Sequence, residues 1–272
     1  ITYGEPNPPA ATDLTKLSVP ELVRLHTHMN EWFARQARLQ LIERTKRTAD
    51  FSSAVRELRV VFGQEKDSAH QLRALWTPYA IGATDKAFTL VSRIRHPDEH
   101  VRAWAVRLFA DHRPLDTVMS DRPRNAGLRV NDECPFFWED LLEAAKAESS
   151  ALVRLALAST LQRLPASQRA ELAMPLVAHK EDAADHNLPA LIWYGLIPLA
   201  ETQPDALPKI ANFCELPLTR RLIARRLAED IEKQPAHVNN LLLLAAAKGE
   251  AFQSDILSGL ADGLAGWRKA TK

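Results

Sequence analysis

The chain has 272 residues, of which 46% are hydrophobic and 25% are charged, and its formal net charge is +1. A chain of this length and composition buries a large core without help from disulfides or metals. The near-zero net charge excludes a general electrostatic attraction to nucleic acid or to an acidic membrane surface. The two cysteines, Cys134 and Cys214, cannot form a disulfide framework, and their spacing favours two free thiols over one bond between them.

The residue usage favours helices. Glycine is scarce, with 9 residues, whereas the 17 prolines are placed to separate one helix from the next. No signal peptide, transit peptide or apolar run long enough to span a membrane is visible in the sequence. The first residue is Ile1 rather than methionine, so we expect a mature or excised segment whose N-terminus does not reveal its localisation.

The first segment, residues 1–12, is rich in proline and is expected to be a linker from a preceding domain that is absent here. Helices are expected from residue 13 onward. Ser18 and Glu21 form a capping-box pattern, and Asn30 is a candidate cap for the helix that follows it.

The central stretch of the chain, residues 96–111, begins with a turn at Pro97 and a cap at Asp98. The apolar residues that follow have helical spacing and form one buried stripe; they are Val101, Ala105, Leu108 and Phe109. A Pro-Asp turn, a Val-Arg pair and small residues in this order are typical of the inner helix of a HEAT-type repeat.

Similar stretches recur along the chain. We take as equivalent points the residues Arg35, Arg73, Arg102, Arg154, Leu191 and Arg221. Most intervals between them are about 30 to 40 residues, close to a HEAT unit, and the longest, about 50, contains an irregular insert. The sequence therefore predicts an all-α, HEAT-like superhelix, a right-handed solenoid of about six helical pairs. The expected parts are N-terminal repeats at 13–112, the insert at 113–135 and C-terminal repeats at 136–272.

The arginines permit two interpretations. Aligned on a concave face, Arg102 and Arg154 would form a basic groove that holds phosphates. The favoured interpretation is that each arginine packs its stem on the next helix and pairs with a nearby acid, for Arg102 either Asp98 or Glu99. The densest basic cluster is Arg220, Arg221, Arg225 and Arg226, for which a solvated face is favoured over an anion-binding patch.

Histidines give weaker signals. His96 and His100, or His26 and His28, lack a third ligand at a suitable spacing, so no metal site is expected. Asp185 and His186, followed by Trp193 and Tyr194, are a candidate proton-transfer or aromatic docking site, but a helix cap with core aromatics is favoured.

No catalytic motif is recognisable, so no catalytic, cofactor-binding or metal-binding residue is predicted. The candidate residues for a partner surface are Arg102, Arg154, Asp185, His186, Trp193, Tyr194, Arg221 and Arg225.

The segment from Asp98 to Leu108 resembles the HEAT region of the PVC-type membrane-bound dehydrogenases, also described as PVC-type haem-binding proteins. Residues 153–165 and 185–195 share the likeness, and residues 13–32 are similar to the entry of the same region. The resemblance extends over about residues 13–230, and residues 113–137 match least.

The resemblance implies a location between an N-terminal β-propeller, similar to quinone-dependent sugar dehydrogenases, and a C-terminal c-type cytochrome domain. It also implies a periplasmic or secreted protein. Haem c or pyrroloquinoline quinone would belong to those neighbouring domains, because this sequence has no Cys-x-x-Cys-His motif and none of the propeller's cofactor residues.

Three hypotheses follow. The preferred one is a non-catalytic scaffold that contacts a protein partner or neighbouring domains of its own chain. The second is a nucleic-acid-binding HEAT protein with a basic concave face. The third is a small-molecule or metal enzyme centred on His186 or His96.

Overall fold

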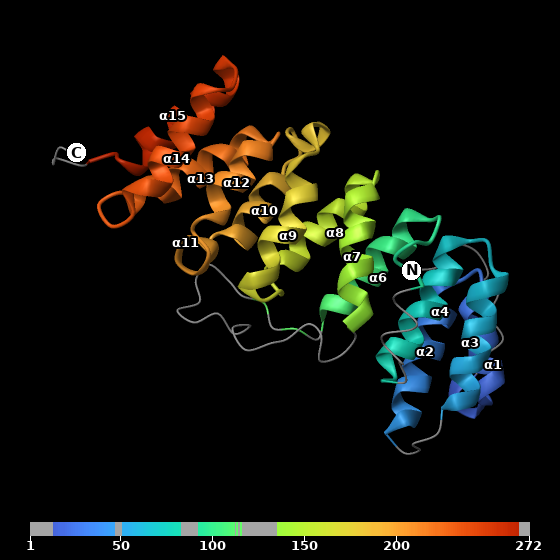
Figure 1. Cartoon of the computed structure of the whole chain (residues 1–272). Coiled ribbons are helices and arrows are strands. Elements are labelled where there is room, and N and C mark those ends of the chain that lie inside the picture. Colours follow the sequence, from blue (N-terminus) through green and yellow to red (C-terminus); the bar gives the residue numbers. More distant parts are fainter. Residues whose placement is uncertain are drawn as a thin grey trace, which may run out of the picture. The chain divides into compact units, whose positions relative to one another are not determined.

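The computed structural model describes residues 13–46, 51–82, 92–111, 113, 115 and 135–266. Within these residues the secondary structure is helical and contains no strand, which confirms the all-α class (Figure 1). The chain divides into two compact units, residues 1–89 and 90–272.

The first unit contains two short 3-10 turns, η1 (Leu14–Lys16) and η2 (Leu25–Thr27). Its helices are α1 (Val19–Arg24), α2 (Glu31–Thr45), α3 (Ser52–Gln64) and α4 (Ser68–Ala80). Helix α3 packs on α1 and α4, and α2 packs on α1 and α4. The core includes Leu22, Leu41 and Leu58, all fully buried.

Local sequence explains where these helices begin. The predicted capping box at α1 is present, with the Ser18 backbone N–H donating to the Glu21 carboxylate at 2.7 Å. The side chain of Asn30 accepts from the backbone N–H of Trp32 at 3.0 Å, as its assignment as a cap predicts. Asp67 caps α4 in the same way, accepting from Ala69 at 2.8 Å.

The second unit has more helices. They are α6 (Glu99–Asp111), α7 (Pro135–Ala147), α8 (Ala151–Leu161), α9 (Ala166–Val177), α10 (Leu188–Leu196), α11 (Leu199–Thr202), α12 (Ala206–Phe213), α13 (Pro217–Glu229), α14 (Pro235–Ala246) and α15 (Glu250–Gly263).

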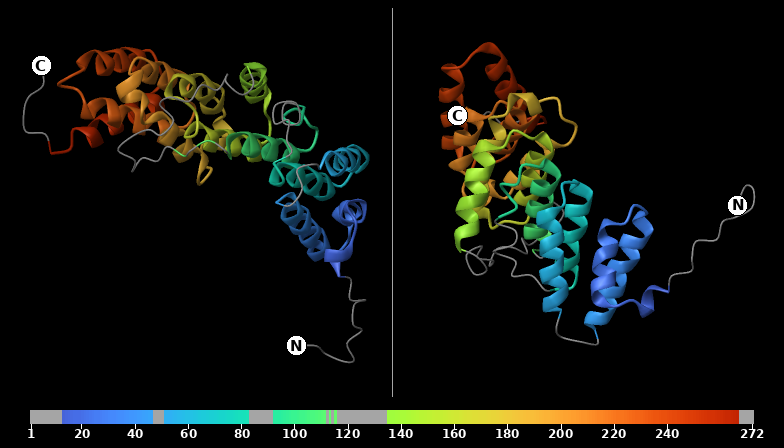
Figure 2. Two further views of the ribbon diagram at one scale, coloured as in Figure 1. Left: turned by 90° about the horizontal axis from the view of Figure 1, so that it is seen from below. Right: turned by 90° about the vertical axis from the view of Figure 1, so that its right-hand side faces the viewer.

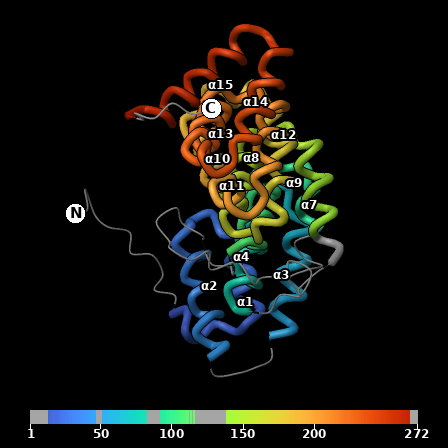
Figure 3. Tube along the Cα trace, turned by 60° about the vertical axis from the view of Figure 1, so that its left-hand side comes forward, coloured from blue at the N-terminus to red at the C-terminus, as the bar shows by residue number. Residues whose placement is uncertain are grey.

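These helices pack in two series. In the first series α6 contacts α8, α8 contacts α10, α10 contacts α13 and α13 contacts α15. In the second series α7 contacts α9, α9 contacts α12 and α12 contacts α14. Figure 3 shows α7, α9 and α12 along one edge with α8, α10 and α13 beside them. Figure 2 shows the helices of this unit from two further sides, with colours that run from green to red along the chain. Contacts between α8 and α9, and between α12 and α13, join the series.

Helices α13 and α15 approach each other closely. A Cβ atom added at Gly259 would lie 2.2 Å from the carbonyl oxygen of Arg221, and one at Gly263 would lie 2.5 Å from that of Arg225. Only glycine lets the two backbones approach this closely, which explains two glycines, four residues apart, on one face of α15.

Two sequence expectations concern residues that are largely outside the described part. The linker at residues 1–12 and nearly all of the insert at 113–135 are among them, as is Cys134. No helix in the described residues is both long and apolar enough to cross a bilayer.

Candidate interaction site at the buried arginines

Three arginines occupy the same place in their helices. Arg102, Arg154 and Arg220 are the fourth residues of α6, α8 and α13. Each side chain donates through one terminal nitrogen to a carbonyl oxygen six residues earlier; the acceptors are His96, Glu148 and Cys214, at 2.8, 3.2 and 2.9 Å. Side chains in the first turn lean toward the helix N-terminus, so a long donor at this position ties the helix to its own entry segment.

Glutamine performs the same role in two other helices. The side-chain amide of Gln71, the fourth residue of α4, donates to the carbonyl oxygen of Glu65 at 2.9 Å, again six residues earlier. That of Gln253, the fourth residue of α15, donates to the carbonyl oxygen of Lys248 at 2.9 Å. The donor at the fourth position therefore recurs in both units.

This geometry corrects part of the expected register. Arg102, Arg154 and Leu191 are equivalent, since each is the fourth residue of its helix. Arg35, Arg73 and Arg221 are not, because the fourth residues of their helices are Ala34, Gln71 and Arg220. The fourth position holds an arginine in some helices, a glutamine in α4 and a residue without a donor in α2 and α10, so aligning the arginines by type shifts the register by one or two residues.

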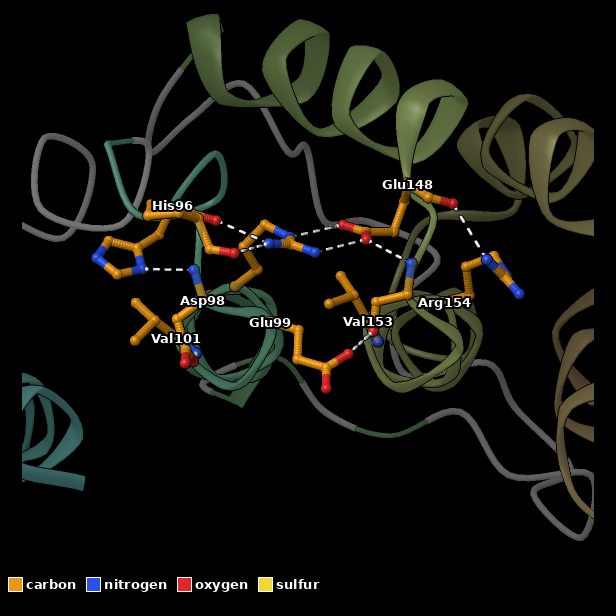
Figure 4. Close-up of polar contacts among 10 residues, drawn as sticks. His96, Asp98, Glu99, Val101, Glu148, Val153 and Arg154 are labelled. Carbon is orange, nitrogen blue, oxygen red and sulfur yellow. Dashed lines mark hydrogen bonds and ion pairs between the residues drawn. The ribbon is translucent and has the colours of Figure 1, made fainter. Parts of the chain in front are cut away.

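Each of the three arginines also binds a carboxylate from a later part of the chain. Arg102 binds Glu148 through two hydrogen bonds of 2.9 and 2.8 Å. Arg154 binds Asp182 through two bonds of 2.6 Å. Figure 4 shows that Glu148 connects two of these arginines: its carboxylate accepts from Arg102, and its main-chain oxygen accepts from Arg154. Two parallel hydrogen bonds between a guanidinium group and a carboxylate fix the relative orientation of the two side chains in addition to pairing their charges.

The acidic partner expected for Arg102 was wrong. Asp98 caps α6, where its carboxylate accepts from the backbone N–H of Val101 at 3.1 Å. Glu99 accepts a hydrogen bond from the hydroxyl group of Ser150 (Figure 4). The carboxylates of Asp98 and Glu99 therefore bind groups at the N-termini of α6 and α8, and Glu148 is the residue that binds the guanidinium group of Arg102.

The Arg102–Glu148 pair is charged at neutral pH. Burial alone would raise the pKa of Glu148, but the hydrogen bonds from Arg102 and from the backbone of Ser150 hold that pKa below its ordinary value. The hydrogen bond to Asp182 raises the pKa of Arg154. The side chains of Arg154 and Asp182 are 2% and 3% exposed, so neither is available to a ligand in this arrangement.

Arg220 of α13 is the third of these arginines. Its guanidinium group binds Asp255 of α15 at 3.0 and 2.6 Å and lies over the ring of Phe252, 4.8 Å from the ring centroid. This contact fixes α15 to α13 beside the close approach at Gly259.

A pocket of about 350 Å³ opens beside the first of these pairs. Arg102 and Glu148 line it together with the apolar side chains of Ile94, Ala144 and Ala147. Arg95, His96 and Ser149 also line it, so the pocket is partly polar. Arg102 already donates to Glu148 and to the carbonyl oxygens of His96 and Pro97.

His96 serves the turn before α6. Its Nδ1 accepts from the backbone N–H of Asp98 at 3.1 Å, and Figure 4 shows its ring on the side away from Glu148. Burial, and then the charge of Arg93, lower the pKa of His96. His100 is exposed, and within the described residues no group of three His, Cys, Asp or Glu side chains is arranged to hold a metal ion.

The structure does not bring the four candidate residues of the α10 segment into one site; they are Asp185, His186, Trp193 and Tyr194. The carboxylate of Asp185 accepts from the backbone N–H groups of Asn187 and Leu188, at 2.8 and 2.7 Å, and so caps α10. His186 is exposed, Trp193 is buried and Tyr194 is 44% exposed. The favoured interpretation, a helix cap with core aromatics, is right for Asp185 and Trp193 and wrong for Tyr194, which lies at the surface.

The basic cluster on α13 is paired throughout. Arg221 binds Asp262 at 2.7 Å, Arg225 binds Glu229 at 3.1 Å and Arg226 binds Asp230 at 2.5 Å. Arg221 and Arg225 remain about half exposed, so of the candidate arginines they are the ones that can reach a partner.

Arg169, the fourth residue of α9, was missed at the sequence level. It is buried, and it donates to the carbonyl oxygens of Leu164 at 2.9 Å and Gly195 at 3.1 Å. Its position four residues after Pro165 was a usable signal, because Pro165 marks the helix start. Glu148 and Asp182 carried no such signal, since their partners are 46 and 28 residues away in the chain.

Cys214 is a free, buried thiol. Its thiol group contacts the carbonyl oxygen of Leu216 at 3.4 Å, and burial raises its pKa to about 11. A thiol with this pKa is protonated at neutral pH and is a structural residue rather than a nucleophile.

The first unit contains a buried histidine from which a pH dependence follows. His26 is 1% exposed, with Nδ1 3.1 Å from the carbonyl oxygens of Leu22 and Val23 and Nε2 2.8 Å from the hydroxyl of Thr77. Burial lowers its pKa from 6.5 to about 4, and the charges of Arg38 and Arg73 act in the same direction.

We expect the first unit to lose stability as the pH falls from about 6.5 to about 4. In this range the unfolded chain binds a proton at His26 and the folded chain does not, so the free energy of unfolding falls by about 3 kcal/mol. Urea unfolding at several pH values measures this loss. A His26→Gln variant should lack this part of the slope, and an unchanged slope in that variant would refute the assignment.

Comparison with known proteins adds no family assignment: no protein-family model matches the chain, and no curated protein matches it significantly.

Proposed function

We propose that this chain is a non-catalytic scaffold, a HEAT-like right-handed solenoid of about six helical pairs that binds a protein partner or neighbouring domains. The observation that carries the proposal is the donor at the fourth helical position, which recurs in α4, α6, α8, α9, α13 and α15. A hydrogen bond that recurs at the same position of several helices is what repeated copies of one structural unit would show, and this supports the proposal. The two series of consecutive helix contacts in the second unit support it.

The candidate arginines already bind carboxylates, which favours a scaffold over a groove that binds nucleic acid. Arg102, Arg154 and Arg221 each bind a carboxylate. A phosphate would have to compete with these carboxylates, and for Arg154 it would have to reach a buried group.

The resemblance supplies the proposed context. A helical region between a propeller dehydrogenase and a c-type cytochrome domain of a periplasmic or secreted protein would set the distance and orientation of the two redox domains. In this proposal haem c or pyrroloquinoline quinone belongs to the neighbouring domains, and this segment holds no cofactor and performs no reaction.

Two assays on the purified chain test the proposal. With sugars or alcohols and a dye acceptor we expect no turnover, and turnover would overturn the non-catalytic assignment. With a labelled DNA duplex we expect no binding between about 50 and 200 mM salt, whereas binding that weakens steeply over this range would favour the nucleic-acid alternative.

A further inference from the structure

Helix α2 has two faces with an unusual distribution of side chains. Its buried face carries Ala34, Ala37 and Leu41. Its outer face carries two larger apolar residues, Trp32 and Leu39, which are 52% and 48% exposed. A helix that keeps small residues inside and places large ones in solvent has an outer face suited to a second contact.

The outer stripe of α2 consists of Trp32, Arg35, Leu39 and Glu43. At 100° per residue these four lie within a sector of about 80°, roughly opposite the buried face. Trp32 and Leu39 are one heptad apart, the spacing at which two helices pack along their length. Arg35 and Glu43, both exposed, are placed four residues before and four residues after Leu39.

This placement of charges is self-complementary. In an antiparallel pair of α2 helices with the two-fold axis at Leu39, Arg35 of one copy faces Glu43 of the other, and the contact occurs twice. The same arrangement brings Lys46 of one copy toward the exposed ring of Trp32 of the other, a favourable cation–π geometry. Lys46 now binds Glu43 of its own helix at 2.7 Å, but such an exposed pair contributes little and can be exchanged.

We propose that the outer stripe of α2 is a self-association surface, on which a second copy of this chain docks its own α2 in antiparallel orientation. The surface is distinct from the buried arginines and does not depend on the proposed scaffold function. The stripe is short, so the dimer is weak and forms in the micromolar range.

Sedimentation velocity of the full chain at about 100 µM tests the proposal, because a weak interface is populated at this concentration. We expect a dimer that Leu39→Glu converts to monomer, since it places two like charges at the axis. Leu243→Glu is the matched control, because Leu243 is 72% exposed on α14 and should leave the dimer intact. A monomeric wild-type chain, or a dimer that survives Leu39→Glu, would overturn the proposal.

Charge reversal tests the orientation. Arg35→Glu and Glu43→Arg should each weaken the dimer on the order of tenfold, because each places two like-charged pairs across the interface. The double variant should restore wild-type affinity, since the pairs are again of opposite sign. Circular dichroism confirms that each variant is folded, and a double variant as weak as the single ones would exclude the antiparallel arrangement.

Discussion

Replacing Arg154 with methionine is expected to lower the free energy of unfolding of the second unit by about 3 to 5 kcal/mol. Methionine fills most of the space but leaves the carboxylate of Asp182 buried, with its side chain 3% exposed and without its two hydrogen bonds of 2.6 Å. The variant also leaves the carbonyl oxygen of Glu148 without the donor that Arg154 provides. Urea unfolding measures the loss.

Two further variants separate the buried pair from a general effect of removing an arginine. Arg154→Met combined with Asp182→Leu should recover a large part of the lost stability, because it removes the uncompensated charge. Arg221→Met should cost far less than Arg154→Met, since the Arg221–Asp262 pair is 50% and 37% exposed and solvent screens it. Equal losses for Arg154→Met and Arg221→Met would contradict the structural role assigned to the buried arginine.

The second large effect is expected at Gly259. Gly259→Val should lower the free energy of unfolding by at least about 3 kcal/mol, above the usual range for overpacking. The reason is that the first added carbon would lie 2.2 Å from the carbonyl oxygen of Arg221 and 2.7 Å from the Cβ of Ala224. The backbone of α13 cannot move aside without separating the two helices. Urea unfolding measures the overall loss, and hydrogen exchange should be faster in α13 and α15.

Gly63→Ala is the matched control for this prediction. Gly63 is also inside a helix, α3, but an added Cβ there would meet no atom within 4 Å. Alanine should therefore stabilise the chain by about 0.5 to 1 kcal/mol through its higher helix propensity. A Gly259 variant as stable as the wild type would mean that α13 and α15 are not in close contact.

Helices and their starts follow from local sequence. Ser18, Asn30 and Asp98 could be assigned as caps because a capping side chain binds backbone groups only two or three residues away. The all-α class follows from the same local patterns. The boundaries of the expected insert, in contrast, lie in or next to residues outside the described part, so they stay predictions.

The ion-pair partners were not predictable from one sequence. Glu148 and Asp182 are as common a type of residue as Asp98 and Glu99, and only the packing of successive helices shows which carboxylate meets which guanidinium. The register of the repeated position was also missed in three helices. In α4 a glutamine, Gln71, replaces the arginine; in α2 the position holds Ala34, and in α13 two arginines are adjacent and Arg220 rather than Arg221 occupies it. A side chain that donates a hydrogen bond recurs at the fourth helical position more often than arginine itself does.

We claim that the buried arginines hold successive helices together rather than bind a ligand. Hydrogen exchange by mass spectrometry on the Arg154→Met variant tests it most directly, because exchange reports opening helix by helix. We predict faster exchange in α8 and α10 and unchanged exchange in α15, which is removed from the lost pair along the series of contacts. Unchanged protection throughout the second unit would contradict the claim.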